Sequence, residues 1–309
     1  MGISLSKNPQ TQVAKTFDNL WQLSRFHTRE SWLAVFPAIW GLAFTVNQSH
    51  TNLPSSQLHL ILSNWFCMTL FHGTFCTWND VCDVNFDKQV ARTKNRPLAA
   101  GRCSIQTAVI WFITQWVITD FLVYTLLGAP ALKVFHPWCF IATIYPFMKR
   151  LVSWPQFILA PAVAGPSFVG WSSINGNSNI EGALPLFIAY SIWTVYFDTA
   201  YGFQDINDDK KAGVGSLAQF LGPNFIKPFL AVTGAVTIGL LGIAATRAQF
   251  TLLFWILGLG IWAASLPFQF NMLDLNDSKS GGKVFGFNIK LGLYISFIAL
   301  TEAGMKFVR

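Results

Sequence analysis

Long apolar runs that are almost free of charged residues constrain the fold of this chain more than any other feature. Nine of them are long enough to cross the roughly 30 Å hydrocarbon layer of a bilayer, at residues 31–47, 58–78, 104–127, 131–147, 157–173, 183–203, 226–247, 250–270 and 285–302. A soluble helix would show a polar face at every turn, and a membrane barrel would alternate polar and apolar residues. Since only helices and closed barrels can span lipid, the pattern predicts an all-α integral membrane protein with nine transmembrane helices.

The basic residues are distributed in a way that indicates membrane topology. The net charge is +7, which by itself would also suit a nucleic-acid partner. When the nine runs are threaded through a bilayer, however, the side that holds the N-terminus receives all of the 21 Lys and Arg residues except Lys133, Arg247, Lys306 and Arg309. Cytosolic loops carry this excess. We therefore expect the lipid bilayer as a partner, no nucleic acid, and a cytosolic N-terminus.

The N-terminal segment suggests where in the cell this membrane lies. Residues 1–30 contain neither the apolar core of a signal peptide nor the Arg-rich pattern of a good mitochondrial presequence. We therefore expect a multi-pass protein of the endoplasmic reticulum or another endomembrane, with the loops of its functional site in the cytosol.

Acidic residues are few and are concentrated in two short stretches of the chain. Of 14 Asp and Glu residues, half lie at Asp80, Asp83, Asp87, Asp198, Asp205, Asp208 and Asp209. In the first stretch, Asn79, Asp83 and Asp87 recur every four residues, which places them on one stripe of a helix. In the second, Asp198, Asp205 and Asp209 fall within about 40° of one face if a single helix continues through them. Each stretch is thus predicted to aim its oxygen atoms in one direction.

Such clusters of carboxylates need a cation. Two close carboxylates repel each other by about 4 kcal/mol near a protein surface, and acids at a membrane edge are functional by default, although ordinary solvated charges are the alternative. Mg²⁺ fits best, because it takes a few carboxylate oxygens and completes its shell with phosphate groups. The nearby Arg92, Arg96 and Lys149 could bind the remaining oxygens of a diphosphate.

The two clusters also suggest the organisation of the chain. They end the second and the sixth expected spans, which indicates two pseudo-repeats of about four helices plus a ninth helix, with a shared site at the repeat interface. We expect residues 1–24 to form a cytosolic N-terminal segment and residues 25–309 a single transmembrane domain. Acids at helix ends, beside basic residues, disfavour a transporter, whose site would lie near the middle of the bilayer.

Three motifs resemble those of a known family. Residues 79–87 read NDVCDVNFD and are followed by Arg92 and by KNRPLA at 94–99, which resembles the first signature of UbiA-type intramembrane prenyltransferases. The DTAY sequence that begins at Asp198, with Asp205 and Asp209 after it, resembles the second signature. Residues 145–156 are similar to the intervening segment of enzymes that prenylate 4-hydroxybenzoate. The resemblance implies nine helices around a central cavity.

The resemblance also implies roles for individual residues. Those expected to be associated with Mg²⁺ are Asn79, Asp83, Asp87, Asp205 and Asp209. Those expected to contact the diphosphate are Arg92, Arg96, Tyr145, Lys149 and Tyr201. Asp198 would bind metal-linked water or help to deprotonate an acceptor, and it joins the four metal-associated Asp residues as a catalytic candidate. Arg25, His72 and Phe75 are candidates for the acceptor or prenyl pocket.

Two reactions are compatible with the resemblance. The first is Mg²⁺-dependent ionisation of an isoprenoid diphosphate, farnesyl diphosphate being the favoured donor, with prenyl transfer to an aromatic or polyketide-derived acceptor in terpenoid or meroterpenoid secondary metabolism. The alternative is a UbiA-type terpene cyclase that converts farnesyl diphosphate into a cyclic sesquiterpene without an acceptor. His72 and Phe75 stand where aromatic-acid prenyltransferases usually carry Arg and Gly, and this difference favours the alternative.

Overall fold

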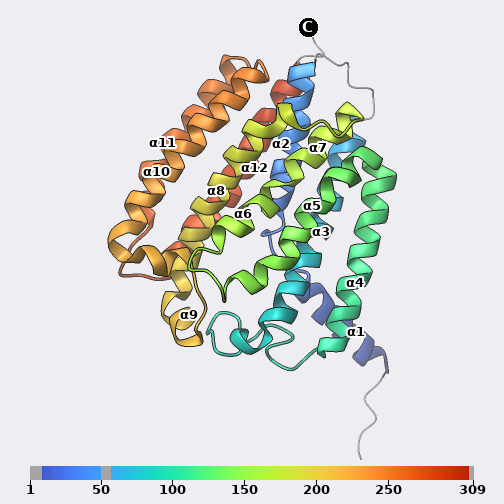
Figure 1. The fold of residues 1–309 in the computed structure, drawn as a ribbon, viewed down its shortest axis with the longest axis vertical. Coiled ribbons are helices and arrows are strands. Elements are labelled where there is room, and N and C mark those ends of the chain that lie inside the picture. Colours follow the sequence, from blue (N-terminus) through green and yellow to red (C-terminus); the bar gives the residue numbers. More distant parts are fainter. Residues whose placement is uncertain (1–8, 50–56, 306–309) are drawn as a thin grey trace, which may run out of the picture.

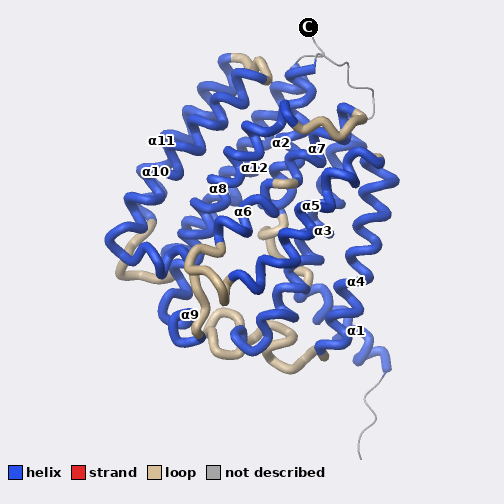
Figure 2. The backbone as a smooth tube through the Cα atoms, in the orientation of Figure 1, coloured by secondary structure: helices blue, strands red, loops and turns tan. Residues whose placement is uncertain are grey.

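The computed structural model describes residues 9–49 and 57–305, and this part of the chain is helical, with no strand in it (Figures 1 and 2). Its helices are α1 (Pro9–Leu23), α2 (Trp32–Ser49), α3 (Gln57–Asp87), α4 (Ile105–Leu122), α5 (Ala129–Met148), α6 (Gln156–Ala164), α7 (Pro166–Asn175), α8 (Leu184–Gly202), α9 (Ile206–Ala212), α10 (Leu217–Arg247), α11 (Ile261–Met272) and α12 (Ser280–Met305), with short π or 3₁₀ segments at Val123–Leu127, Glu181–Ala183, Phe203–Asp205 and Phe254–Gly260. The expected all-α class is confirmed.

All nine apolar runs fall on helical segments, although several boundaries differ from those expected. The second run belongs to a helix that continues to Asp87, and the fifth is divided at Gly165 into α6 and α7. Among the residues that the structure describes, four helical segments are long and apolar enough to cross a membrane, at 105–127, 156–175, 217–247 and 280–305. The count of nine spans is not confirmed and stays a prediction. Lys306, Arg309 and the first eight residues of the expected N-terminal segment lie outside the described residues.

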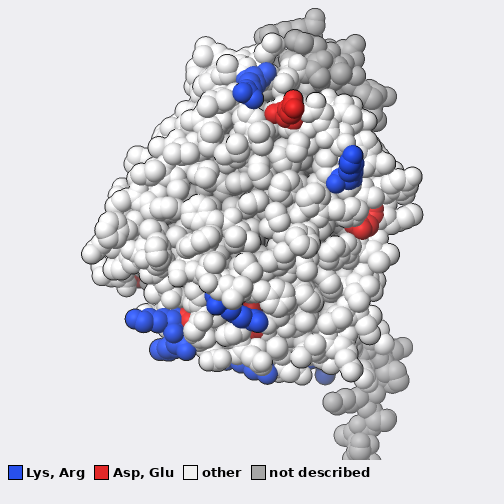
Figure 3. Space-filling model, in the orientation of Figure 1, with Lys and Arg blue, Asp and Glu red and all other residues white. Residues whose placement is uncertain are grey.

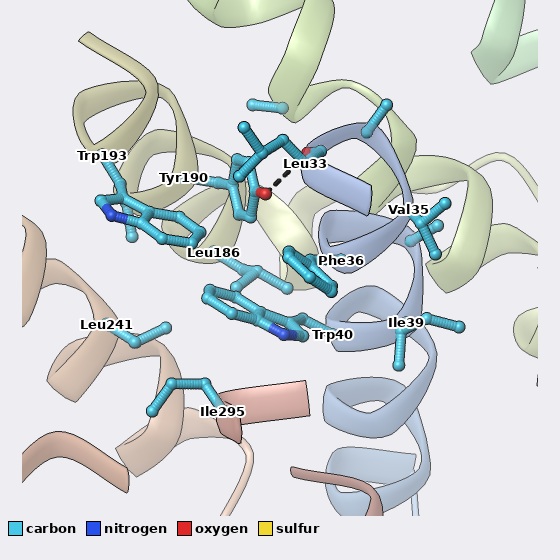
Figure 4. Packing of buried hydrophobic residues seen from close by; sticks show 14 of the residues in the cluster. Leu33, Val35, Phe36, Ile39, Trp40, Leu186, Tyr190, Trp193, Leu241 and Ile295 are labelled. Carbon is cyan, nitrogen blue, oxygen red and sulfur yellow. Dashed lines mark hydrogen bonds between the residues drawn. The ribbon is translucent and has the colours of Figure 1, made fainter. Parts of the chain in front are cut away.

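A large aromatic core joins α2, α8 and α12 (Figure 4). Trp40 stacks on Trp193 with ring centroids 5.5 Å apart, and the Tyr190 hydroxyl donates a 2.7 Å hydrogen bond to the Leu33 carbonyl oxygen. The Trp40 indole N–H donates to Ser296 Oγ at 2.8 Å. Burying large rings whose polar atoms have partners fixes the three helices relative to one another.

Glycines allow α2 and α7 to approach closely. A Cβ atom at Gly170 would collide with the Ala38 carbonyl, and one at Gly41 would collide with the Ser167 carbonyl. Small residues at such crossings are typical of membrane helices, because they let the two backbones touch.

We expect Gly170→Ala to destabilise the protein by about 1–3 kcal/mol, since neither backbone can move aside without repacking the core. The measurement is the melting temperature of the detergent-purified protein by size-exclusion chromatography. Gly239→Ala is the matched control, because a Cβ at this α10 position meets no atom within 4 Å. Equal melting temperatures for the two variants would contradict the close α2–α7 contact.

Charged residues gather at one end of the bundle. Figure 1 shows α9 and the loop after α3 together at the lower end, and most Lys and Arg side chains visible in Figure 3 lie there, below a broad region with few charges. This is the end at which both acidic stretches lie, so the fold brings them to the same region.

Candidate functional site

A cavity of about 320 Å³ extends into the bundle from this charged end. Helices α2, α3, α5, α6, α8, α9 and α12 and the loops between them line it, whereas α4, α7, α10 and α11 contribute none of its described lining residues. Along α3 the lining runs from Asp87 to Phe71, about 24 Å at 1.5 Å per residue. The fourteen residues proposed from the sequence all line this cavity: Arg25, His72, Phe75, Asn79, Asp83, Asp87, Arg92, Arg96, Tyr145, Lys149, Asp198, Tyr201, Asp205 and Asp209.

The first cluster lies on the last two turns of α3, where the predicted stripe is present. Lys149 Nζ donates hydrogen bonds to Asn79 Oδ1 at 2.9 Å and to Asp83 Oδ2 at 2.8 Å. Arg150 adds a 3.3 Å contact to the other oxygen of Asp83. Asp87 is paired with Arg96 at 3.0 Å. Each buried carboxylate of the stripe therefore has a basic partner, which offsets much of the cost of its burial.

The second cluster does not lie on one continuous helix, so that expectation was wrong. Helix α8 ends at Gly202, a 3₁₀ turn follows at Phe203–Asp205, and α9 begins at Ile206. The 3₁₀ turn interrupts the α-helical period between Asp198 and Asp209, so the 40° arithmetic does not apply to them. The cavity nevertheless collects all three acids, because the turn keeps Asp205 beside the end of α8.

Arg92 connects the loop after α3 to the second cluster. Its Nε and Nη2 atoms bind both oxygens of Asp205 at 2.6–3.2 Å, and its Nη1 donates to the Tyr201 hydroxyl at 3.1 Å. The guanidinium also lies 5.0 Å from the centre of the Tyr201 ring. The residue before Arg92 also contacts this region, because the Ala91 N–H donates a hydrogen bond to Asp208 Oδ2 at 3.0 Å. A forked contact of this kind fixes both position and orientation, so the loop is held across the mouth of the cavity.

Asp80 is a residue whose importance the sequence analysis missed. It is almost fully buried, lines the cavity, and pairs with Arg25 at 2.7 Å and Arg96 at 3.0 Å, while its Oδ2 atom has no partner among the described residues. A spacing signal could have found it: Asp80 and Asp87 are seven residues apart, which puts them within about 20° of each other on a helix. Arg96 binds both.

The carboxylate and amide oxygens that line the cavity are ligands that Mg²⁺ prefers, although they do not form a preorganised coordination site. Within residues 9–49 and 57–305, no group of three or more His, Cys, Asp and Glu side chains is close enough to hold a metal. Asp209, however, makes no ion pair in this part of the chain, and burial, followed by the Asp205 charge, raises the pKa of Asp209 to about 7. A carboxyl that lacks a positive partner, facing a cavity lined by Asn and Asp oxygens, has the chemistry that fits Mg²⁺.

The three residues suggested for an acceptor or prenyl pocket also line the cavity, and two of them, His72 and Phe75, lie on α3 toward the Phe71 end of its lining stretch. Arg25 has a left-handed backbone (φ 57°), and its guanidinium is occupied by the Gln22 and Leu23 carbonyls and by Asp80. A His72 ring nitrogen lies 3.5 Å from the sulfur of Cys76. Phe75 packs edge-on against Phe71, Phe112 and Trp116. Both terminal nitrogens of Arg25 thus already have partners, and Phe75 forms part of an apolar surface.

Comparisons with known proteins agree with this architecture. Residues 34–296 match the UbiA prenyltransferase family. A polyprenyl transferase of Arthrobotrys oligospora is 46% identical over 284 residues, covering 91% of this chain and 77% of that protein. A polyprenyl transferase of Penicillium terrestre is 42% identical over 304 residues, covering 98% of this chain and 94% of that protein.

Solved structures share the fold. A UbiA homolog from Aeropyrum pernix K1 superposes with a TM-score of 0.66 at 20% identity, covering 91% of this chain and 98% of that one. A UbiA homolog from Archaeoglobus fulgidus bound to DMAPP and Mg²⁺ gives a TM-score of 0.64 at 18% identity, covering 90% and 99%. At these identities the likeness concerns the fold alone.

Proposed function

Because the chain belongs to the UbiA prenyltransferase family, we propose that this membrane enzyme transfers a farnesyl group from farnesyl diphosphate to an aromatic or polyketide-derived acceptor. The observation that supports this most is the cavity itself, which combines a mouth lined by both acidic clusters with an interior of apolar residues such as Phe71, Leu159 and Val163. The charged mouth matches the diphosphate group of an isoprenoid diphosphate, and the apolar interior matches its hydrocarbon chain. The names of the fungal relatives support transfer over cyclisation.

The basic residues at the mouth would bind and stabilise the leaving group. Lys149, Arg92 and Arg96 would exchange part of their contacts with Asp83, Asp205 and Asp87 for diphosphate oxygens, with Tyr145 and Tyr201 as hydroxyl donors. Asn79, Asp83, Asp87, Asp205 and Asp209 would hold Mg²⁺, which when bound would neutralise phosphate charge as a Lewis acid. Preorganised charges of this kind act most strongly where water is excluded.

The transfer step then proceeds in the apolar interior. The C1–O bond of the donor breaks and its electron pair leaves with the diphosphate, while a ring carbon of the acceptor forms a bond to C1. The proton displaced from that ring carbon passes to Asp198, the candidate base beside the mouth. Phe197 and Phe285, which line the cavity, can shield the developing allylic cation through their ring faces.

The test uses membranes that contain the full chain, with farnesyl diphosphate, Mg²⁺ and a panel of phenolic acceptors. We expect a prenylated arene only when an acceptor is present, and loss of product with excess EDTA that is restored by added Mg²⁺. Mass spectrometry detects the arene and headspace analysis any volatile terpene. A cyclic hydrocarbon formed without an acceptor would establish the cyclase alternative and refute transfer, and full activity in EDTA would refute the metal requirement.

The membrane setting is proposed on the same grounds. We place residues 25–309 in one transmembrane domain of two pseudo-repeats plus a ninth helix, in the endoplasmic reticulum or another endomembrane, with the mouth of the cavity facing the cytosol. The excess of Lys and Arg at that end supports the orientation. The accessibility of Lys210 and Lys211, both exposed at this end, to a membrane-impermeant amine reagent in sealed microsomes tests it: modification without detergent is expected, and protection would reverse the orientation.

A further inference from the structure

Glu30 is a cavity-lining acid to which neither the family signatures nor the metal clusters assign a role. It lies in the loop between α1 and α2 and is half-buried. Its backbone is fixed, because its N–H donates to Thr28 Oγ1 at 3.3 Å and its carbonyl accepts the Leu33 N–H at 3.1 Å. Its carboxylate makes no ion pair or hydrogen bond within the part of the chain that the structure describes. Glu30 therefore presents an unpaired negative charge to the cavity.

Glu30 lies within electrostatic range both of residues at the diphosphate end and of His72, which is deeper along α3. The Glu30 charge is close enough to interact electrostatically with Arg25 and His72 on one side and with Arg92 and Tyr201 on the other. Arg92 and Tyr201 are proposed above to hold the diphosphate. A second substrate that approaches the C1 carbon of the donor from the part of the cavity lined by Arg25 and His72 would therefore come close to Glu30.

The charges of the cavity disfavour an anionic second substrate. Of the described residues, four cationic side chains line the cavity, and each already has an acidic partner: Arg25 pairs with Asp80, Arg92 with Asp205, Arg96 with Asp80 and Asp87, and Lys149 with Asp83. Seven acidic side chains line it in all. A carboxylate on the acceptor would lose its hydration beside Glu30 with no cation left to offset that loss.

Resting on the proposed transferase function, we infer that the acceptor is an uncharged hydroxyarene and that Glu30 binds it by accepting a hydrogen bond from its phenolic hydroxyl. A hydrogen bond to a charged acceptor is stronger than a neutral one. It also draws the phenolic proton toward Glu30 and so increases electron density at the ring carbons ortho and para to that oxygen, which are the carbons that attack C1. Glu30 therefore orients the acceptor and also selects an acceptor that carries no negative charge.

The experiment compares two acceptors that differ by one carboxylate, 5-methylbenzene-1,3-diol and 2,4-dihydroxy-6-methylbenzoic acid, in membranes with farnesyl diphosphate and Mg²⁺. For the wild-type chain we expect kcat/KM for the diol to exceed that for the acid by about 10-fold or more. Glu30→Gln should lower kcat/KM for the diol by about 10- to 100-fold, leave the KM for the donor unchanged, and reduce the preference for the diol. Glu30→Asp, which keeps the charge, should retain that preference.

His72→Arg provides the converse variant. It adds a cation within electrostatic range of Glu30 that offsets the Glu30 charge, so we expect the preference to shift toward the acid. A wild-type preference for the acid, or an unchanged ratio of the two acceptors in folded Glu30→Gln, would overturn the assignment of Glu30. If Glu30→Gln does not fold, the wild-type ratio and the Glu30→Asp and His72→Arg ratios decide the matter. Failure of the wild-type chain to prenylate any arene would instead refute the transferase function.

Discussion

Asp205→Asn is expected to lower prenyl transfer by about 100- to 1000-fold while the protein stays folded. The amide keeps the size of the side chain and one oxygen that can accept from Arg92, but it removes the negative charge that both Arg92 and a bound Mg²⁺ require. Asp83→Asn should have a similar effect through the other cluster, where Lys149 bridges Asn79 and Asp83. The measurement is kcat for prenylated product at saturating donor, at several Mg²⁺ concentrations.

The control for both variants is Asp277→Asn. Asp277 is a partly exposed acid in the loop before α12 that pairs with Lys283 at 3.2 Å, outside the cavity, and surface pairs contribute little to stability. Melting temperatures of all three variants should stay near that of the wild type. Full activity in a double Asp83→Asn, Asp205→Asn variant would remove the two-cluster metal hypothesis altogether.

Asp80→Ala is expected to destabilise the protein by about 3–5 kcal/mol, because it leaves the buried guanidinium of Arg25 without its counter-charge. The loss of stability should exceed the loss caused by removing any single acid at the cavity mouth. Asp80 is the most deeply buried of the Asp residues, and it pairs with both Arg25 and Arg96. The measurement is the yield and melting temperature of detergent-purified protein.

Glu181→Ala is the matched comparison, an exposed acid in the short turn before α8. If the melting temperatures of Asp80→Ala and Glu181→Ala agreed within about 1 °C, the Arg25–Asp80 pair would contribute nothing measurable to stability. A second variant, Arg25→Met with Asp80→Leu, replaces both charges by apolar groups of similar size and should recover part of the stability, since such exchanges are often neutral for buried ion pairs.

Much of the architecture could be predicted from the sequence because lipid imposes simple rules. Runs of about 20 apolar residues specify helices whatever their neighbours do, and the helix period alone placed Asn79, Asp83 and Asp87 on one stripe. The same arithmetic was wrong for Asp198 to Asp209. The helix period alone does not show where a helix stops, and α8 ends at Gly202, between the two acids.

Contacts between distant segments could not be predicted from spacing. Arg92 and Asp205 are 113 residues apart in the chain, and their pairing depends on how the loop after α3 folds over the mouth of the cavity. Glu30 gave no signal because it is a single acid in an irregular loop, and it becomes informative only when the loop is seen to line the cavity. The seven-residue spacing from Asp87 could have identified Asp80. It was overlooked because Asp80 does not belong to the four-residue repeat of Asn79, Asp83 and Asp87.

The absence of α4, α7, α10 and α11 from the described cavity wall has a consequence for protein engineering. Positions on these four helices can be changed for heat tolerance without altering a residue that lines the cavity, so stability and substrate range can be optimised in parallel libraries. Changes on α10 and α11 that raise the melting temperature should combine almost additively with changes on α2, α3 and α6 that alter the donor or acceptor, provided that the sites lie more than about 10 Å apart. A stabilised scaffold could then tolerate the cavity mutations that a new substrate requires.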